Sequence, residues 1–135
     1  MELSFVYGLK KVGLPLVITS GELNNWCFLL DTGSTHNIIF SFVYEHFKDK
    51  FKAMNIGTNI MGIEGDSKQT SIVEGTFNFG GNDYTSTFCI LDANDAMNQI
   101  FTESGIQIHG IIGTQFLIEN AWVVDYKKFV VYENE

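Results

Sequence analysis

The segment Trp26-Cys27-Phe28-Leu29-Leu30-Asp31-Thr32-Gly33-Ser34 is closely followed by Ile38-Ile39-Phe40, and it is the most informative part of the chain. Two short apolar runs, rich in strand-forming residues, enclose a polar turn that carries one carboxylate. Polar groups held on loops between buried strands are common at sites of chemistry. Asp31 is therefore the first candidate for a catalytic residue.

The Asp-Thr-Gly-Ser turn also has a purely structural interpretation. In that case Asp31 accepts hydrogen bonds from the backbone of its own turn, and Gly33 provides a positive φ. The string occurs once in 135 residues. If Asp31 is catalytic and needs a second carboxylate of the same kind, a second copy of the chain has to supply it.

The composition predicts one domain over residues 1–135, because 45% hydrophobic residues, 18% charged residues and one proline suit one core. The net charge is −8, and no basic run is longer than Lys10-Lys11 or Lys127-Lys128, so no nucleic-acid partner is expected. The apolar stretch 14–18 is too short for a membrane span. We expect a soluble protein without a membrane partner, in the cytoplasm by preference, because no signal peptide or transmembrane segment is seen.

The cysteines and histidines predict neither a metal site nor an organic cofactor. Cys27 and Cys89 lie inside apolar runs, as small core residues do, and leave a disulfide open without forming a framework typical of secreted proteins. His36, His46 and His109 are not spaced as metal ligands.

The periodicity of the chain is mainly that of β-strands. Residues 14–19 and 26–30 predict a hairpin. One amphipathic helix then follows, with Ser41 as its N-cap. Its apolar positions at helical spacing are Phe40, Val43, Tyr44, Phe47 and Phe51.

Strand alternation returns between Ile56 and Leu91, with a turn at residues 80–83. One face of the middle strand is expected to carry Val73, Gly75, Phe77 and Phe79. Residues 61–67 hold two glycines between strand-like arms, and they fit either a mobile hairpin tip or an ordinary surface turn.

The last third of the chain predicts three further elements. A short helix is expected around residues 95–101. An apolar strand from Ile108 ends at Gly113 and leads into a short helix that Thr114 is expected to cap. Residues 122–132 predict a final hairpin.

Three features, in this order, resemble the single-domain retropepsin-like aspartic proteases. They are Leu29-Leu30-Asp31-Thr32-Gly33-Ser34, a glycine-bearing hairpin, and Ile111-Ile112-Gly113 followed by a short helix. The resemblance implies a mainly β fold, closed into a barrel, with one amphipathic helix and one short helix. It also implies that the Ile111-Ile112-Gly113 strand lies beside the Asp31 loop, and that two subunits form a homodimer.

The implied activity is that of an aspartic endopeptidase acting on polypeptides. One Asp31 takes a proton from water while the partner's, still protonated, binds the substrate carbonyl. The resemblance assigns support of this loop to Thr32, Gly33 and Ser34. The Ser34 hydroxyl is expected to donate to the outer oxygen of Asp31, which favours the ionised form and predicts an acidic optimum.

The resemblance places substrate contacts on two segments of the chain. The first comprises Gly33, Thr35 and His36, and the second is the hairpin tip with Gly62, Ile63, Glu64 and Gly65. Retroviral members typically have two acidic residues where this chain has Thr35-His36, and a surface position explains His36 equally well. The tail also continues through a hairpin, so the retroviral interface sheet is not implied.

The main alternative is a retropepsin-like dimer that binds extended peptides by strand addition without cutting them. The substitution Asp31→Asn separates these hypotheses, because it abolishes cleavage by a protease and leaves binding largely intact. A cysteine hydrolase using Cys27 lacks a recognisable context. A ligand-carrying small β-barrel has no need for Asp-Thr-Gly at a strand end.

Overall fold

The computed structural model describes residues 1–20, 25–61 and 67–134, with residues 55–61 and 67–69 described as backbone only. Within these ranges the chain is mainly β. Its elements in chain order are β1 (Glu2–Ser4), α1 (Val6–Val12), β2 (Leu16–Ile18), β3 (Cys27–Leu30), β4 (Ile38–Phe40), α2 (Ser41–His46), β5 (Phe51–Met61), β6 (Ser67–Phe79), β7 (Asn82–Leu91), α3 (Asn94–Ser104), β8 (Gly110–Ile112), α4 (Thr114–Glu119), β9 (Trp122–Asp125) and β10 (Val130–Glu133).

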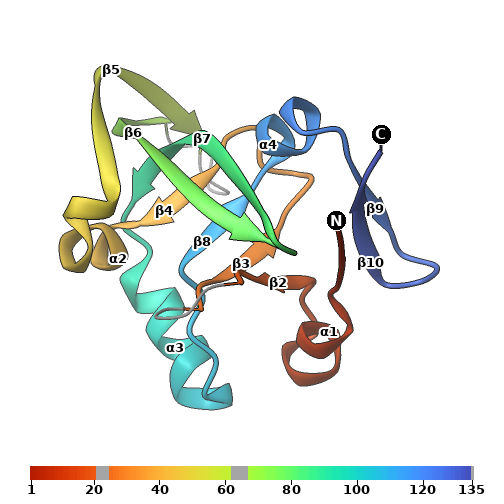
Figure 1. Ribbon diagram of the computed structural model, residues 1–135. Coiled ribbons are helices and arrows are strands. Elements are labelled where there is room, and N and C mark those ends of the chain that lie inside the picture. The colour runs from red at the N-terminus through yellow and green to blue at the C-terminus, as the bar shows by residue number, and fades with distance from the viewer. Residues whose placement is uncertain (21–24, 62–66, 135) are drawn as a thin grey trace.

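The larger sheet has seven strands in the order β2-β3-β8-β4-β7-β6-β5 (Figure 1). The predicted first hairpin is confirmed, with β2 and β3 antiparallel and Val17 opposite Phe28. At the centre of the sheet, β8 runs parallel to β3 and antiparallel to β4. The two strands that flank the Asp31 loop are thus joined through the strand that ends at Ile112.

The larger sheet curls, but its edge strands are not joined by a ladder among the described residues, where a closed barrel was expected. The order of its strands leaves β2 and β5 at opposite edges. Just beyond β2, the Ser20 backbone N–H donates to the Asn78 carbonyl oxygen of β6 at 2.8 Å. The described sheet therefore returns toward itself at this hydrogen bond.

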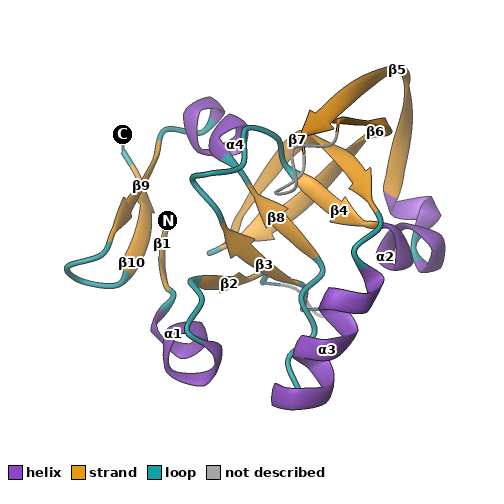
Figure 2. Ribbon diagram, turned by 180° about the vertical axis from the view of Figure 1, so that it is seen from behind, coloured by secondary structure: helices purple, strands orange, loops and turns teal. Residues whose placement is uncertain are grey.

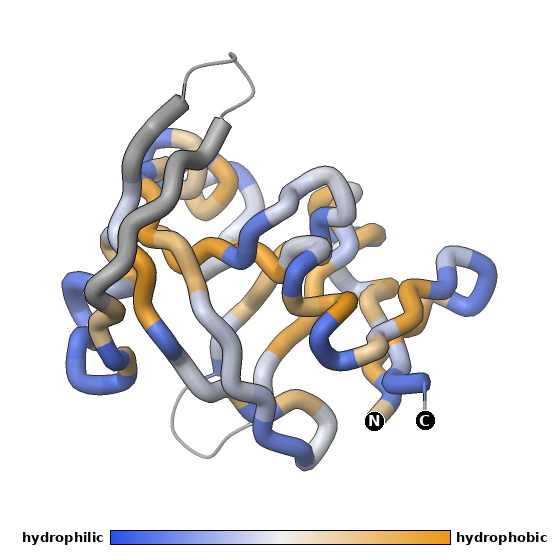
Figure 3. Tube along the Cα trace, turned by 90° about the horizontal axis from the view of Figure 1, so that it is seen from above, coloured by the Kyte–Doolittle hydropathy of each residue, from blue (hydrophilic) through white to orange (hydrophobic). Residues whose placement is uncertain are grey.

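Aromatic side chains fill the space that the curled sheet encloses. Phe28 lies 5.0 Å, centroid to centroid, from Phe77 and 5.8 Å from Phe79. The predicted alternation of β6 is confirmed, because Val73, Gly75, Phe77 and Phe79 are buried while their neighbours are not. Figure 3 shows the hydrophobic segments gathered along the inner strands and the hydrophilic ones in peripheral turns.

The amphipathic helix exists but is shorter than predicted. α2 spans Ser41–His46, and a 3₁₀ turn follows at Lys48–Lys50. Ser41 is its first residue, not its N-cap, and its hydroxyl donates to the Asn94 side chain at 3.4 Å. Phe51 instead begins β5, where its ring lies 6.0 Å from that of Trp26, so packing in the sheet overrides the helical period.

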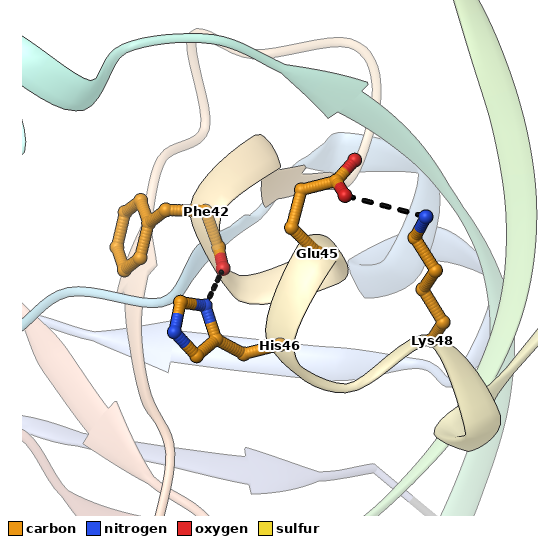
Figure 4. Close-up of polar contacts among 4 residues, drawn as sticks. All are labelled: Phe42, Glu45, His46 and Lys48. Carbon is orange, nitrogen blue, oxygen red and sulfur yellow. Dashed lines mark hydrogen bonds and ion pairs between the residues drawn. The ribbon is translucent and has the colours of Figure 1, made fainter.

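The end of α2 is held by two local polar contacts (Figure 4). Glu45 and Lys48 form an ion pair of 3.3 Å between exposed side chains. The His46 Nδ1 lies 2.9 Å from the carbonyl oxygen of Phe42, one helical turn earlier. His46 is thus engaged with its own helix.

The predicted helix around residues 95–101 is confirmed and extends over Asn94–Ser104, where Gly105 ends it at a φ of 77°. It lies beside α2 at the margin of the sheet (Figure 2). Within the described residues, no helix has both the length and the apolar character needed to cross a membrane.

The two ends of the chain share the smaller sheet, whose order is β1-β10-β9. The predicted final hairpin, β9 and β10, is confirmed, whereas β1 and α1 were not predicted. In addition to the pairing of β1 with β10, the Glu133 backbone N–H donates to the Met1 carbonyl oxygen at 3.2 Å. The N- and C-terminal ends therefore lie side by side (Figure 1).

Candidate active site

Asp31 lies at the point where β3 ends, and the residue is partly exposed. Its backbone N–H donates to the Ile112 carbonyl oxygen of β8 at 3.0 Å. Its Oδ1 accepts a hydrogen bond of 2.9 Å from the Gly33 backbone N–H. The last bond is also the one that an ordinary Asx turn makes, so the catalytic and structural interpretations share it. The structural interpretation also expected a positive φ at Gly33, and that expectation is wrong, because Gly33 is not among the residues with a positive φ.

The Ser34 hydroxyl makes a different contact from the predicted one. It donates to the His36 carbonyl oxygen at 2.7 Å instead of to Asp31. The Ser34 backbone N–H donates to the Asp31 carbonyl oxygen at 3.1 Å. Ser34 therefore bonds within its own loop through both its hydroxyl and its backbone. The prediction that this hydroxyl favours the ionised form of Asp31 is wrong, so the hydroxyl gives no reason to expect an acidic optimum.

The loop that follows Asp31 is bound to the start of α4 (Figure 2). The Thr114 and Gln115 backbone N–H groups donate to the carbonyl oxygens of Ser34 and Thr35 at 2.8 and 3.3 Å. The Thr114 hydroxyl donates to the Thr32 carbonyl oxygen at 3.0 Å. Thr114 was expected to cap the helix, but Gly113 is at the N-cap and no side chain caps it, since the hydroxyl is engaged by the loop.

The strand with Ile111, Ile112 and Gly113 lies directly beside the Asp31 loop. Leu29 pairs with Ile111 across the parallel ladder, and Leu30 with Ile112. A Cβ on Gly113 would lie 2.4 Å from the His36 carbonyl oxygen. Only glycine lets the loop backbone come this close.

The other predicted site residues lie around this loop or beyond the described ranges. Thr32, Gly33 and Thr35 are exposed and His36 is partly exposed. The predicted substrate contacts at Gly62, Ile63, Glu64 and Gly65 lie outside the described residues.

Asn37 is a site residue that the sequence analysis missed. It is 0% exposed and stands between the Asp31 loop and β4. Its side chain bonds to the backbone of Gly113, Phe116 and Thr87. The only signal in the sequence was a polar residue placed directly before the apolar run that starts at Ile38.

The cysteines lie apart from this chemistry. Both are free, and burial raises the pKa of the Cys27 thiol to about 11 and also raises the pKa of Cys89. His109 contacts the backbone of Cys27, since its Nδ1 accepts the Cys27 backbone N–H at 3.0 Å. A thiol with a raised pKa is a poor nucleophile, which argues against the cysteine hydrolase.

Comparison with known proteins establishes the class of fold. No family model matches the sequence, and no curated protein is similar to it in sequence. In structure, the chain is similar to the retroviral protease-like domain of Ddi1 from Leishmania major, with a TM-score of 0.55 and 13% identity. The similarity covers 92% of this chain and 96% of that one. The described chain has a retropepsin-like fold.

Proposed function

We propose that this chain is an aspartic endopeptidase whose active site is completed by Asp31 of a second copy. The observation that carries the proposal is the placement of Asp31 at an accessible strand end, on a loop bound to β8 and to α4. A catalytic carboxylate needs such a loop, because the approach to water and substrate has to be open while the position is fixed. The retropepsin-like fold supports the same assignment.

In the proposed mechanism, two Asp31 side chains face each other across a two-fold axis and share one proton. The ionised one accepts a proton from water as that water attacks the peptide carbonyl carbon. The protonated one gives its proton to the carbonyl oxygen, which forms a gem-diol. The first Asp31 then gives the proton it took from water to the leaving amine nitrogen as the C–N bond breaks, while the second takes back a hydroxyl proton as the product carboxyl group forms. The chemistry uses water as nucleophile and proposes no metal or organic cofactor.

The test is peptide hydrolysis across pH 3–8 by the wild-type chain and Asp31→Asn. The amide keeps the Oδ1 that accepts the Gly33 N–H, so the fold is retained while proton transfer is lost. We expect kcat to fall by about 10²–10⁴-fold. The matched control is Asp125→Asn, because Asp125 Oδ1 accepts the Lys127 N–H at 2.8 Å in a turn of the other sheet, and it should cleave as the wild type does.

Two outcomes would overturn parts of this proposal. Cleavage that persists in Asp31→Asn would exclude the aspartic mechanism. Extended-peptide binding by both chains, with cleavage by neither, would favour the non-catalytic peptide-binding dimer. An acidic optimum remains a prediction of proton sharing, and activity that rises steadily to neutral pH would contradict it.

A further inference from the structure

The Asn37 side chain connects three separate elements at the base of the Asp31 loop. Its Oδ1 accepts the Gly113 backbone N–H at 3.0 Å and the Phe116 backbone N–H at 3.2 Å. Its Nδ2 donates to the Ser86 hydroxyl at 3.1 Å and to the Thr87 carbonyl oxygen at 3.2 Å. All four hydrogen-bonding positions of one buried amide are thus used.

The chemistry of the partners demands an amide at this position. The two N–H groups of Gly113 and Phe116 are donors only, so the atom facing them must be an acceptor. The Thr87 carbonyl oxygen is an acceptor only, so the atom facing it must be a donor. Neither a carboxylate nor an aliphatic side chain of this size satisfies both requirements.

A second set of contacts fixes the orientation of the Ser86 hydroxyl that Asn37 meets. Ser86 is 5% exposed, and its Oγ donates to Glu119 Oε2 at 3.0 Å. The hydroxyl proton is therefore engaged by the carboxylate, and a lone pair of Oγ faces the Asn37 amide. Gln115 Nε2 holds the other oxygen of Glu119 at 2.8 Å and the Thr87 hydroxyl at the same distance.

From these contacts we propose that Asn37 is a positioning residue for Asp31, with Ser86 and Glu119 orienting its amide. Asn37 fixes Gly113 and the first turn of α4, and that turn in turn holds the carbonyl oxygens of Thr32 and Ser34. The loop between Asp31 and Asn37 is thereby bound at both ends to one rigid base. The part of this proposal that concerns catalytic activity rests on the proposed function.

The test compares Asn37→Asp with the wild type by two independent measurements. The carboxylate keeps one oxygen for Gly113 and Phe116 but sets its other oxygen against the Thr87 carbonyl oxygen. We expect kcat to fall by about 10–100-fold with KM little changed, because displacement of a reacting group affects the chemical step. Amide hydrogen exchange should accelerate at Gly113, at Phe116, and in the loop amides of Asp31 and Ser34.

Lowering the pH should partly restore the activity of Asn37→Asp. When its carboxyl group is protonated at low pH, its O–H can again donate to the Thr87 carbonyl oxygen. The ratio of variant to wild-type kcat should therefore rise as the pH is lowered. A ratio that is the same at every pH, in a folded variant, would contradict the donor role of the Asn37 amide.

The matched control is Asn120→Asp. Asn120 is the C-cap of α4, at the opposite end of the helix from the loop, and its Nδ2 also donates to a backbone carbonyl oxygen, that of Phe116 at 3.0 Å. This variant should keep the wild-type kcat and loop exchange. If Asn37→Asp does not fold, Ser86→Ala decides the question by the same two measurements, since it removes one of the two Nδ2 partners.

The outcomes separate this proposal from the proposed function. Unchanged loop exchange in folded Asn37→Asp, or a kcat equal to that of the wild type, would overturn the positioning role. If the wild type shows no Asp31-dependent cleavage, the proposed function fails. The exchange measurement then still decides whether Asn37 holds the loop.

Discussion

At Gly113, the absence of a side chain permits the closest backbone approach around Asp31. A Cβ there would lie 2.4 Å from the His36 carbonyl oxygen and 2.7 Å from that of Ser34. Both are backbone atoms, so the loop itself would have to move. We expect Gly113→Ala to lower the free energy of unfolding by about 2–3 kcal/mol, measured by urea denaturation.

Gly33→Ala is the matched control for this close approach. Its Cβ would meet Asp31 Oδ1 at 3.2 Å, the end of a side chain that can rotate away. The change in the free energy of unfolding should stay below about 1 kcal/mol. Equal costs at both glycines would show that the loop is not closely packed on Gly113.

The two thiols provide a second prediction for single residues. With its pKa raised to about 11 by burial, Cys27 is ionised to only about one part in a thousand at pH 8. We expect neither Cys27 nor Cys89 to react measurably with a disulfide reagent until the chain is unfolded. Rapid reaction of the folded protein at pH 8, followed by absorbance, would contradict this assignment.

Single residues were predictable where their chemistry is local. Asp31 and Gly113 could be found from the sequence, because a polar turn or a glycine after an apolar run is visible within a few residues. The Ser34 hydroxyl and Asn37 could not be assigned in this way. The partners of Asn37 lie 49–79 residues away in the chain, and only the folded sheet brings them together.

Asp31 follows the parallel pair of strands β3 and β8. The start of β3 is held by the neutral imidazole of His109. His109 Nδ1 accepts the Cys27 N–H, and its ring stacks on Trp26 at 5.4 Å. Burial lowers the pKa of His109 below its ordinary 6.5. As the pH falls below 6.5, the unfolded chain binds a proton that the folded chain does not, so stability is lost until the lowered pKa is reached.

We therefore expect His109→Asn to reduce the loss of stability between pH 7 and 5. The asparagine oxygen can accept the Cys27 N–H without titrating, and one proton contributes at most about 1.4 kcal/mol per pH unit. Urea denaturation at several pH values measures the slope. His46→Asn is the comparison variant, because His46 is exposed and its Nδ1 lies 2.9 Å from the Phe42 carbonyl oxygen of its own helix. A slope reduced equally in both variants would contradict the assignment to His109.

Elements were predictable where periodicity and burial agree. The alternation of β6 and the hairpins β2–β3 and β9–β10 fit this condition. The length of α2 was not predictable, because Phe51 continues the helical spacing while its ring packs against Trp26 as part of β5. The short strand β1 pairs with β10 at the other end of the chain, so no local pattern marks it.

The proposed homodimer can be tested by mixing wild-type and Asp31→Asn subunits. If each active site needs Asp31 from both copies, an equal amount of Asp31→Asn should take half of the wild-type subunits into inactive mixed dimers. Wild-type activity should then fall to about half, under conditions where subunits exchange and dimers are saturated. Unchanged activity would contradict a shared site, provided that an affinity tag on the Asp31→Asn chain retains the wild-type chain and so demonstrates mixed dimers.

Because β1 pairs with β10, the same fold should form when the chain begins and ends at a different place. Because Met1 and Glu133 are joined by a hydrogen bond, a short glycine linker can connect the two ends without disturbing either sheet. New ends opened between Gly80 and Gly81, in the exposed turn after β6, would give a circular permutant. We expect this rearranged chain to show the circular dichroism spectrum and cooperative unfolding of the original.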